Sequence, residues 1–243
     1  MLCFIHGMAG NSRNWETQYA QFGDRYRVIG WDAPGYGGSD DWPTEDPAVS
    51  DYVSMIVCLL NALGVRTAHM VGHSFGGTLI PAVQKVQPER VASMVLAQPV
   101  IGSGSLGAVK QADIIAAREY LLAELGVEAY AKHHAPRSVA ASAGAATVKK
   151  GIEVTSWTRP KGYMAQWRAM ARADIFQEIG EALCPATVIA GTGDKTASQE
   201  VVKRIAAAIS GAHFVELRDV GHMIYLEHPD RFNRALADHL AQA

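Results

Sequence analysis

Short runs of apolar and β-branched residues alternate along this chain with longer stretches that place apolar residues at helical spacing. The short runs predict strands over residues 2–5, 27–31, 67–71, 91–97, 186–190 and 213–217. The longer stretches predict helices over residues 15–22, 49–63, 75–86, 199–209 and 229–241. Strands that alternate with helices are typical of a parallel sheet with helices on both faces. We therefore expect an α/β fold with a doubly wound, mostly parallel sheet.

Residues 100–175 interrupt this alternation. The segment begins with a stretch rich in glycine and serine, 102–107, and then becomes alanine-rich and helical without a strand signal. We expect residues 1–99 and 176–243 to form one core, and residues 100–175 to be a helical insertion in it.

The composition narrows the possible functions. With 243 residues, of which 49% are hydrophobic, and a formal net charge of −2, the chain has the composition of a soluble globular enzyme. It contains no long basic stretch that would indicate a nucleic-acid partner, and no apolar run of the ~18 residues that a membrane-spanning helix needs. No spacing of ligand residues suggests a metal site, so we expect neither a metal nor a cofactor. The oligomeric state stays open.

Three cysteines, Cys3, Cys58 and Cys184, lie in or beside apolar segments. Their odd number argues against a disulfide framework and predicts free thiols in a reducing compartment. Met1 leads directly into the first predicted strand, without the layout of a signal peptide. We therefore expect a cytoplasmic protein.

A G-x-S-x-G pentapeptide carries the strongest chemical signal, with Ser74 at its centre (Gly72-His73-Ser74-Phe75-Gly76). It lies between the predicted strand 67–71 and the predicted helix 75–86. A serine flanked by glycines at these spacings can occupy a sharp strand-to-helix turn, with its Oγ standing clear of the sheet. The pattern predicts a nucleophilic serine, and a serine in an ordinary glycine turn is the alternative.

Four stretches in the same order resemble the α/β hydrolase family. They are residues 4–10, 32–39, 72–77, and the late pair 191–194 and 221–222. The resemblance implies the order nucleophile, acid, histidine along the chain, and it implies that residues 100–175 are the helical cap of that family. Members usually have two strands before the first strand found here. We therefore expect either a reduced sheet edge, without those N-terminal strands, or a start inside a longer gene.

Three residues match the catalytic roles of that family. Ser74 would be the nucleophile, which needs a base within hydrogen-bond reach. His222 would be the general base and later the general acid, because an imidazole with an ordinary pKa of about 6.5 can take up and return a proton near neutrality. Asp194 follows the predicted strand 186–190 at its carboxyl end, where parallel sheets place their sites, and would hold one tautomer of His222.

Two other polar residues compete for the role of the acid. Gln98 occupies the rival position after the predicted strand 91–97, but it carries no charge. Asp32 is a carboxylate, and we expect it to shape the turn over residues 34–37 instead. Asp194 is therefore the preferred partner of the histidine.

Two backbone N–H groups are expected to form the oxyanion hole. One belongs to Phe75, directly after the nucleophile, and the other to Met8, in the loop after the first strand. Gly7 and Gly10 allow that loop to bend close to the reacting carbonyl. We expect His6 to brace the loop rather than to act as a base.

Four side chains of the insertion are candidates for an apolar substrate pocket over Ser74. They are Trp157, Tyr163, Met164 and Trp167. Packing inside the insertion is the alternative for each of them, since apolar residues at helical spacing more often belong to a core. Arg137 and Arg159 are candidates to meet a substrate carboxylate, with solvated surface as the alternative.

These residues predict a serine hydrolase that cleaves a small-molecule carboxylic ester or lactone with water, through an acyl-enzyme. Residues 159–163, 170–175 and 184–186 resemble enol-lactone hydrolases of aromatic-compound breakdown, especially 3-oxoadipate enol-lactonases. The serine at the elbow argues against haloalkane dehalogenases and epoxide hydrolases, which place an aspartate there.

Three alternatives share the same triad. Hydrolases that cleave carbon–carbon bonds of ring-cleavage products often carry asparagine before the nucleophile, where this chain has His73. A weakly catalytic ligand receptor and a cofactor-free perhydrolase or haloperoxidase are the other two, and neither is separated from a hydrolase by the motifs alone.

Overall fold

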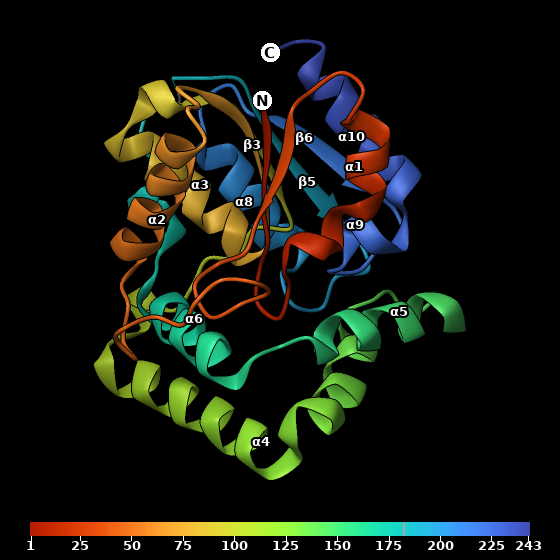
Figure 1. Ribbon diagram of the computed structural model, residues 1–243. Helices are drawn as coiled ribbons and strands as arrows, with labels where there is room; N and C mark the ends of the chain where they lie inside the picture. Colours follow the sequence, from red (N-terminus) through yellow and green to blue (C-terminus); the bar gives the residue numbers. More distant parts are fainter. Residues whose placement is uncertain (182) are drawn as a thin grey trace.

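The computed structural model describes residues 1–181 and 183–243, and its centre is a parallel sheet of six strands (Figure 1). The strand order is β2-β1-β3-β4-β5-β6, and every neighbouring pair is parallel. The strands are β1 (Leu2–Ile5), β2 (Val28–Trp31), β3 (Ala68–His73), β4 (Val91–Ala97), β5 (Ala186–Gly191) and β6 (His213–Leu217). The predicted doubly wound α/β sheet is confirmed.

Helices cover both faces of the sheet (Figure 1). One face carries α1 (Glu16–Phe22), α9 (Ile224–Glu227) and α10 (Pro229–Leu240). The other carries α2 (Val49–Ala62), α3 (Phe75–Val86), α7 (Ile175–Glu178) and α8 (Gln199–Ala208). Short 3-10 turns complete the described elements: η1 (Ser12–Trp15), η2 (Pro88–Arg90), η3 (Gly104–Leu106) and η4 (Ala135–Arg137).

The alternation of side chains along β1 shows how the sheet divides the core. Leu2 and Phe4 pack into the cluster that contains Phe232 of α10. Cys3 and Ile5 face the opposite cluster, which contains residues of α2, α3 and α8. All four β1 side chains are fully buried. Because successive side chains of a strand point to opposite faces, an apolar strand of this kind requires cover on both sides.

Helices α4 (Ala108–His134), α5 (Ala145–Ser156) and α6 (Pro160–Arg172) form a separate layer across one end of the sheet (Figure 1). Helix α4 is kinked at Gly126, whose φ of 68° is not helical. In the described part of residues 98–185 the structure contains no strand of the sheet. The predicted helical cap is therefore present, and the domain limits of 100 and 175 stay a prediction.

The third strand is longer than the pattern predicts, and the difference matters for the site. The predicted end at residue 71 moves to His73, because Gly72 and His73 continue the pairing with Leu96 and Ala97 of β4. Ser74 therefore follows the strand without a spacer, and α3 begins at Phe75. The carboxyl ends of the other five strands lie within one residue of the predicted positions.

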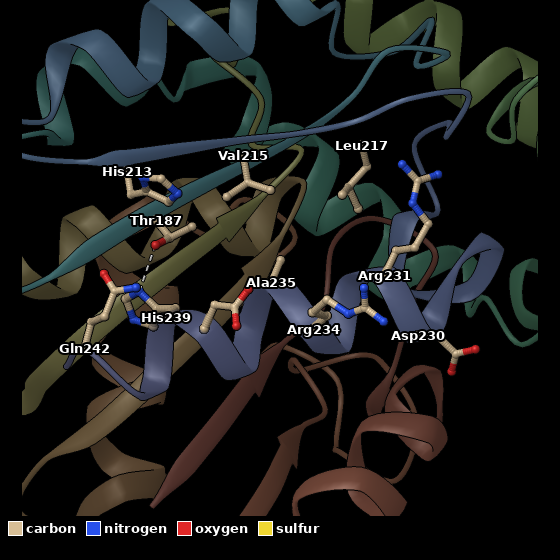
Figure 2. Close-up of a pocket in the computed structure, with 11 residues that line it drawn as sticks. Thr187, His213, Val215, Leu217, Asp230, Arg231, Arg234, Ala235, His239 and Gln242 are labelled. Carbon is tan, nitrogen blue, oxygen red and sulfur yellow. Dashed lines mark hydrogen bonds between the residues drawn. The ribbon is translucent and has the colours of Figure 1, made fainter.

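A surface pocket of about 370 Å³ lies between β6 and α10 (Figure 2). Inside it, His239 Nδ1 shares a hydrogen bond of 2.9 Å with the Thr187 hydroxyl, and burial lowers the pKa of His239 to about 4. Thr187 is the second residue of β5, so the pocket lies toward the beginning of that strand. The predicted catalytic residues follow the ends of the strands, and none of them lines this pocket.

Across the described residues, none of the helices combines the length and hydropathy needed to cross a membrane. Cys3, Cys58 and Cys184 form no disulfide.

Candidate active site

Ser74 occupies a sharp turn between β3 and α3. Its φ of 53° and ψ of −120° lie in a region that residues with a side chain rarely adopt. The turn is held at its start by the Ser74 N–H, which donates to the Ala97 carbonyl at 2.9 Å, and at its end by the Ser74 carbonyl, which accepts from the Gly77 N–H at 2.9 Å. A Cβ on Gly76 would collide with the backbone carbonyls of Ile5 and His6, so glycine is required there for α3 to approach β1.

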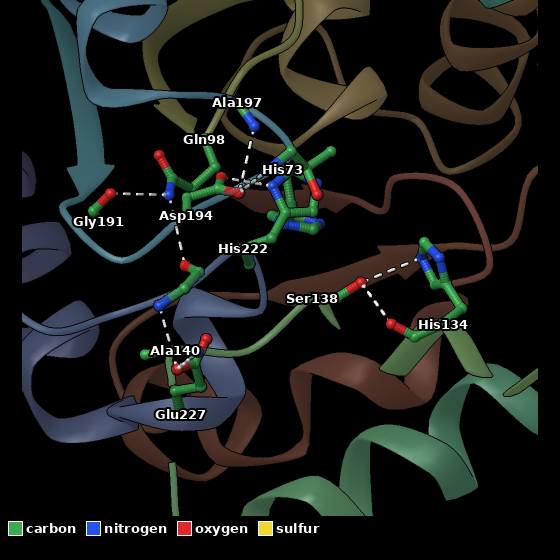
Figure 3. A network of polar contacts seen from close by, with 12 residues as sticks. His73, Gln98, His134, Ser138, Ala140, Gly191, Asp194, Ala197, His222 and Glu227 are labelled. Carbon is green, nitrogen blue, oxygen red and sulfur yellow. Dashed lines mark hydrogen bonds and ion pairs between the residues drawn. The ribbon is translucent and has the colours of Figure 1, made fainter. Parts of the chain in front are cut away.

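Asp194 and His222 form a buried pair at the ends of β5 and β6. The carboxylate Oδ2 lies 2.7 Å from Nδ1 of His222, and the Asp194 side chain is completely buried (Figure 3). The other oxygen, Oδ1, accepts from the backbone N–H groups of Thr196 and Ala197 at 2.6 and 3.1 Å. With Nδ1 bonded to the carboxylate as a donor, Nε2 of the neutral ring is the nitrogen that can accept a proton.

His73 links the loop of His222 to the turn of Ser74. Its Nε2 lies 2.7 Å from the His222 carbonyl oxygen, and the two imidazole rings are 4.8 Å apart between centroids (Figure 3). Burial, reinforced by the neighbouring His222, lowers the pKa of His73 well below its ordinary value. His73 is therefore neutral and donates its Nε2 proton to that carbonyl. This bond fixes the His222 backbone beside the residue that precedes Ser74.

The structure brings Ser74 and His222 into the same neighbourhood but does not join their side chains. Within the residues it describes, no hydrogen bond connects the Ser74 hydroxyl to the imidazole of His222. Such catalytic bonds are often long or misaligned without a substrate and tighten in the complex. The contact between hydroxyl and imidazole therefore stays a prediction.

The loop after β1 runs directly against the nucleophile. A Cβ on Gly7 would lie 2.7 Å from the Cβ of Ser74, which leaves room for glycine alone. The backbone N–H groups of Met8 and Phe75 donate to no acceptor in the part of the chain that the structure describes. Neither N–H group is therefore occupied by a described protein acceptor, and their role as an oxyanion hole stays a prediction.

His6 braces that loop through both ring nitrogens. Nδ1 donates to the Gly7 carbonyl at 2.7 Å, and Nε2 accepts from the Ala33 N–H at 3.1 Å. Burial lowers the pKa of His6, so the ring stays neutral. Asp32 accepts from the N–H groups of Ser12 and Gly38 at 2.6 and 3.0 Å. The bond from Gly38 holds the chain at the end of the turn over residues 34–37, which we expected Asp32 to shape.

Two residues to which the sequence assigned no structural role hold the loops of the acid and the histidine. Gln98, which has a φ of 48°, donates its side-chain amide to the carbonyls of Gly191 and Gly221 at 3.4 and 3.3 Å. Glu227 accepts from the N–H groups of Gly221 and Ala140 at 3.0 and 2.8 Å (Figure 3). The position of Gln98 after a strand was the available signal; no motif pointed to Glu227.

The cap contacts the histidine loop directly. The carbonyl of Ser138 accepts from the N–H groups of His222 and Met223 at 2.9 and 3.0 Å. The cap layer is therefore fixed to the backbone of His222, and the described helices α4 and α6 meet above the ends of the strands.

The candidate pocket residues do not all lie together. Tyr163, Met164 and Trp167 are on α6, where the Tyr163 and Met164 side chains are buried and Trp167 is partly exposed. Trp157 lies elsewhere, in a surface cleft of about 480 Å³ beside Asp32, with the guanidinium of Arg13 5.5 Å from its ring centroid. A place for these four side chains in a pocket over Ser74 stays a prediction.

The two candidate arginines meet protein groups. Arg159 pairs with Asp41 and donates to the Ser39 carbonyl, and exposed Arg137 donates to the His133 carbonyl. Among the described residues, no cluster of histidine, cysteine, aspartate or glutamate could hold a metal ion.

The model of the alpha/beta hydrolase fold matches residues 1–229. The chain belongs to the α/β hydrolase fold family. A relative from Acinetobacter baylyi, (E)-2-((N-methylformamido)methylene)succinate hydrolase, is 25% identical over 237 residues, which are 97% of this chain and 88% of the relative.

Two solved structures share this fold. A thermophilic esterase from Thermogutta terrifontis superposes with a TM-score of 0.88 at 22% identity, covering 99% of this chain and 89% of the esterase. The enol-lactonase from Burkholderia xenovorans LB400 superposes with a TM-score of 0.82 at 24% identity, covering 99% of this chain and 90% of that one. Both likenesses show the shared fold.

Proposed function

We propose that this member of the α/β hydrolase fold family is a serine hydrolase that cleaves a carboxylic ester or lactone of a small molecule through an acyl-enzyme. The observation that carries the proposal is the buried Asp194–His222 pair, 2.7 Å between Oδ2 and Nδ1, beside the strained turn of Ser74. A carboxylate in this position selects the tautomer that leaves Nε2 free to accept a proton.

In the first half-reaction Ser74 Oγ attacks the substrate carbonyl carbon while His222 Nε2 takes the serine proton. The carbonyl oxygen becomes negative, and the N–H groups of Met8 and Phe75 bind it; donors fixed in this way stabilise the charge that develops in the transition state. His222 then returns its proton to the leaving alkoxide or enolate oxygen, and the acyl group stays on Ser74.

The second half-reaction uses the same groups in reverse roles. His222 takes a proton from water, whose oxygen attacks the acyl carbon, and the proton returns to Ser74 when the ester bond to the enzyme breaks. Asp194 remains ionised throughout and stabilises the imidazolium. In a lactone the leaving oxygen belongs to the acyl group itself, so the product is one hydroxy acid or its keto form.

The cap supports a small substrate. Helices α4 and α6 lie over one end of the sheet (Figure 1), and we propose that Tyr163, Met164 and Trp167 of α6 line the acyl pocket there. We propose residues 100–175 as the segment that determines the acyl group. The enol-lactonase and esterase structures with this fold support an ester or lactone as the bond cleaved.

Turnover by Ser74→Ala tests the assignment. Purified protein and the variant would be assayed against 4-nitrophenyl esters, lactones and ring-cleavage dienes, with Ser142→Ala, an exposed serine of the cap, as the matched control. We expect ester or lactone hydrolysis by the wild type and by the control, and its loss in Ser74→Ala. Wild-type rates in Ser74→Ala would remove the nucleophile. Turnover of dienes alone would move the reaction to carbon–carbon bonds, and binding without turnover would favour a receptor.

A further inference from the structure

Arg118 lies on the apolar, inward face of a cap helix. Ile114 and Leu122, one turn before and one turn after it on α4, are themselves partly or fully buried. Residues four apart share one face of a helix, so Arg118 points with them toward the inside of the cap. Its guanidinium carbon lies 4.5 Å from the ring centroid of Trp167 on α6. Arg118 itself is partly exposed, so a ligand can approach its charge.

Three arginines of the cap, Arg159, Arg168 and Arg172, have acidic partners, whereas Arg118 and the exposed Arg137 have none among the described residues. Arg168 pairs with Glu119, and Arg172 pairs with Asp46 at 2.6 Å. Among the residues that the structure describes, Arg118 forms no ion pair. Its positive charge is therefore available to an anion that enters the cap.

Two buried tyrosines lie beside this charge. The hydroxyls of Tyr130 and Tyr163 are 2.7 Å apart, and the two residues are 1% and 2% exposed. Burial raises the pKa of both hydroxyls, and the nearby Arg118 offsets only part of the increase. Both groups therefore remain neutral O–H donors. Because one of them donates to the other, the second keeps its proton for a ligand.

Contacts through His134 and Ser138 link the two tyrosines to the loop of His222. The ring of His134 stacks on Tyr130, with centroids 5.2 Å apart and planes 12° apart. His134 Nε2 lies 3.1 Å from the Ser138 hydroxyl, and the Ser138 carbonyl accepts from the His222 N–H at 2.9 Å. The pair is thus connected to the loop of the general base through two neighbouring residues.

The fourth polar residue of the cap to consider is Gln166, which lies on α6 with Tyr163 and has no hydrogen-bond partner among the described residues. Gln166 is completely buried on α6, and neither its amide oxygen nor its amide nitrogen has a hydrogen-bond partner in the described part of the chain. It lies four residues after Gly162, at which α6 touches the backbone of Gly35 in the core. Residues four apart share a helix face, so the unpaired amide faces the same interface between cap and core. A buried amide without partners is costly and calls for a polar ligand.

We propose that Arg118, Tyr130, Tyr163 and Gln166, here named the Arg118 cluster, bind a carboxylate of the substrate at the end of the acyl chain away from the scissile bond. The inference rests on the proposed ester or lactone hydrolysis, whose substrate class it narrows to monoesters or lactones of acids with a second carboxyl group.

The chemistry of the cluster favours a carboxylate over other anions. It offers one guanidinium, which matches the single charge of a carboxylate and presents parallel N–H donors to its two oxygens. Neutral phenol and amide donors can complete its hydrogen bonds without adding charge. A phosphate monoester would bring close to two negative charges to a single positive one. A neutral hydroxyl would leave Arg118 without a counter-charge.

Two 4-nitrophenyl esters of equal chain length test the proposal. One is the hexanoate, and the other is the monoester of hexanedioic acid, which adds a terminal carboxylate. The measured quantity is the ratio of kcat/KM for the acidic ester to kcat/KM for the neutral ester, so that a general loss of activity cancels. Arg118→Gln removes the charge, and Lys110→Gln removes an exposed charge from the first turn of the same helix.

We expect the wild type and Lys110→Gln to prefer the acidic ester, and Arg118→Gln to lower the ratio about 10- to 100-fold, the usual effect of losing a hydrogen bond to a charged partner. The same ratio in Arg118→Gln and wild type would overturn the subsite while leaving the hydrolase intact.

Binding separates the two proposals. Titration of Ser74→Ala with hexanedioate in a calorimeter needs no turnover, and Ser74→Ala combined with Arg118→Gln is its control. Binding that is lost in the double variant supports the subsite even if neither ester is hydrolysed, in which case the proposed function alone fails. Binding that is equal in both proteins overturns the subsite, and tighter Arg118-dependent binding of hexyl phosphate overturns the choice of a carboxylate.

Discussion

Replacing Asp194 by asparagine changes the proton position of His222 with little change in shape. The carboxylate accepts from Thr196 and Ala197 through Oδ1, at 2.6 and 3.1 Å, and bonds His222 Nδ1 through Oδ2 at 2.7 Å. Asparagine has one acceptor oxygen. The two backbone N–H groups can only donate, so they hold that oxygen on their side. The NH₂ group of the new side chain then faces Nδ1 of His222.

This arrangement forces the wrong tautomer. A donor that faces Nδ1 makes that nitrogen an acceptor and moves the ring proton to Nε2, which then cannot take the proton of Ser74. In serine hydrolases with this triad the same change lowers kcat about 10⁴-fold, or about 5.4 kcal/mol at 1.36 kcal/mol per factor of ten. We expect a loss of that size, with the substituted protein still folded because the two side chains have the same shape.

The assay is the initial rate of 4-nitrophenol release from 4-nitrophenyl hexanoate, with thermal unfolding as the check on folding. Asp219→Asn is the matched control, because Asp219 is exposed in the same loop as His222 and its φ of 55° suits asparagine. The control should retain its activity. If Asp194→Asn instead stayed within about a factor of two of wild type, the acid would be another carboxylate and the reasoning from the Asp194–His222 bond would fail.

Three further substitutions test the packing around the site. Gln166→Met replaces the unpaired buried amide by an apolar chain of similar length. It should stabilise the protein by about 1–3 kcal/mol and lower kcat/KM for the acidic ester. A drop in Tm would show that the amide is paired. Glu227→Gln keeps an acceptor for the Gly221 N–H but cannot ionise. Burial raises the pKa of Glu227 above 4.5, so the wild type loses stability as pH rises from 4.5 through the raised pKa. The Tm of Glu227→Gln relative to wild type should therefore increase over that range. A difference in Tm between the two proteins that stays constant with pH would refute the raised pKa. Gly76→Ala should destabilise by about 1–3 kcal/mol or more because its Cβ meets the backbone of β1. Gly180→Ala, in open space and without a positive φ, should be neutral or slightly stabilising.

The central strands β1, β3, β4 and β5 were predictable because they are buried on both faces and therefore read as mostly apolar runs. β4 and β6 begin and end where the pattern places them. The turn at Ser74 was predictable for a steric reason, since Gly72 and Gly76 lie where any Cβ would collide. The adjacency of Asp194 and His222 follows from the pairing of β5 with β6, which brings the ends of those two strands together.

The interior of the cap was not predictable in the same way. Its helices are joined by loops whose geometry no motif specifies, and α4 bends at Gly126. Trp157 shared the aromatic signal of Tyr163 and Trp167, yet it lines a surface cleft beside Asp32 that neither of those two residues lines. Arg118 did carry a signal, a charge at helical spacing among isoleucine and leucine, but the pattern alone does not show that the charge lacks a partner.

Glu227 shows a second limit of sequence reasoning. Its carboxylate joins Gly221 to Ala140, which lies 87 residues earlier in the chain. Contacts of this length depend on how two segments pack, and one sequence gives no sign of them. The hydrogen bonds that hold a loop in place are therefore seen only in the folded structure.

Labelling with a fluorophosphonate tests most directly whether the hydroxyl of Ser74 is activated by the imidazole of His222. The modified residue would be located by mass spectrometry of peptides from the wild type and from His222→Ala, after equal times of exposure to the probe. We expect one added phosphonyl group on Ser74 in the wild type and little or none in His222→Ala. Equal labelling of Ser74 in both proteins, or labelling of a different residue, would contradict the account.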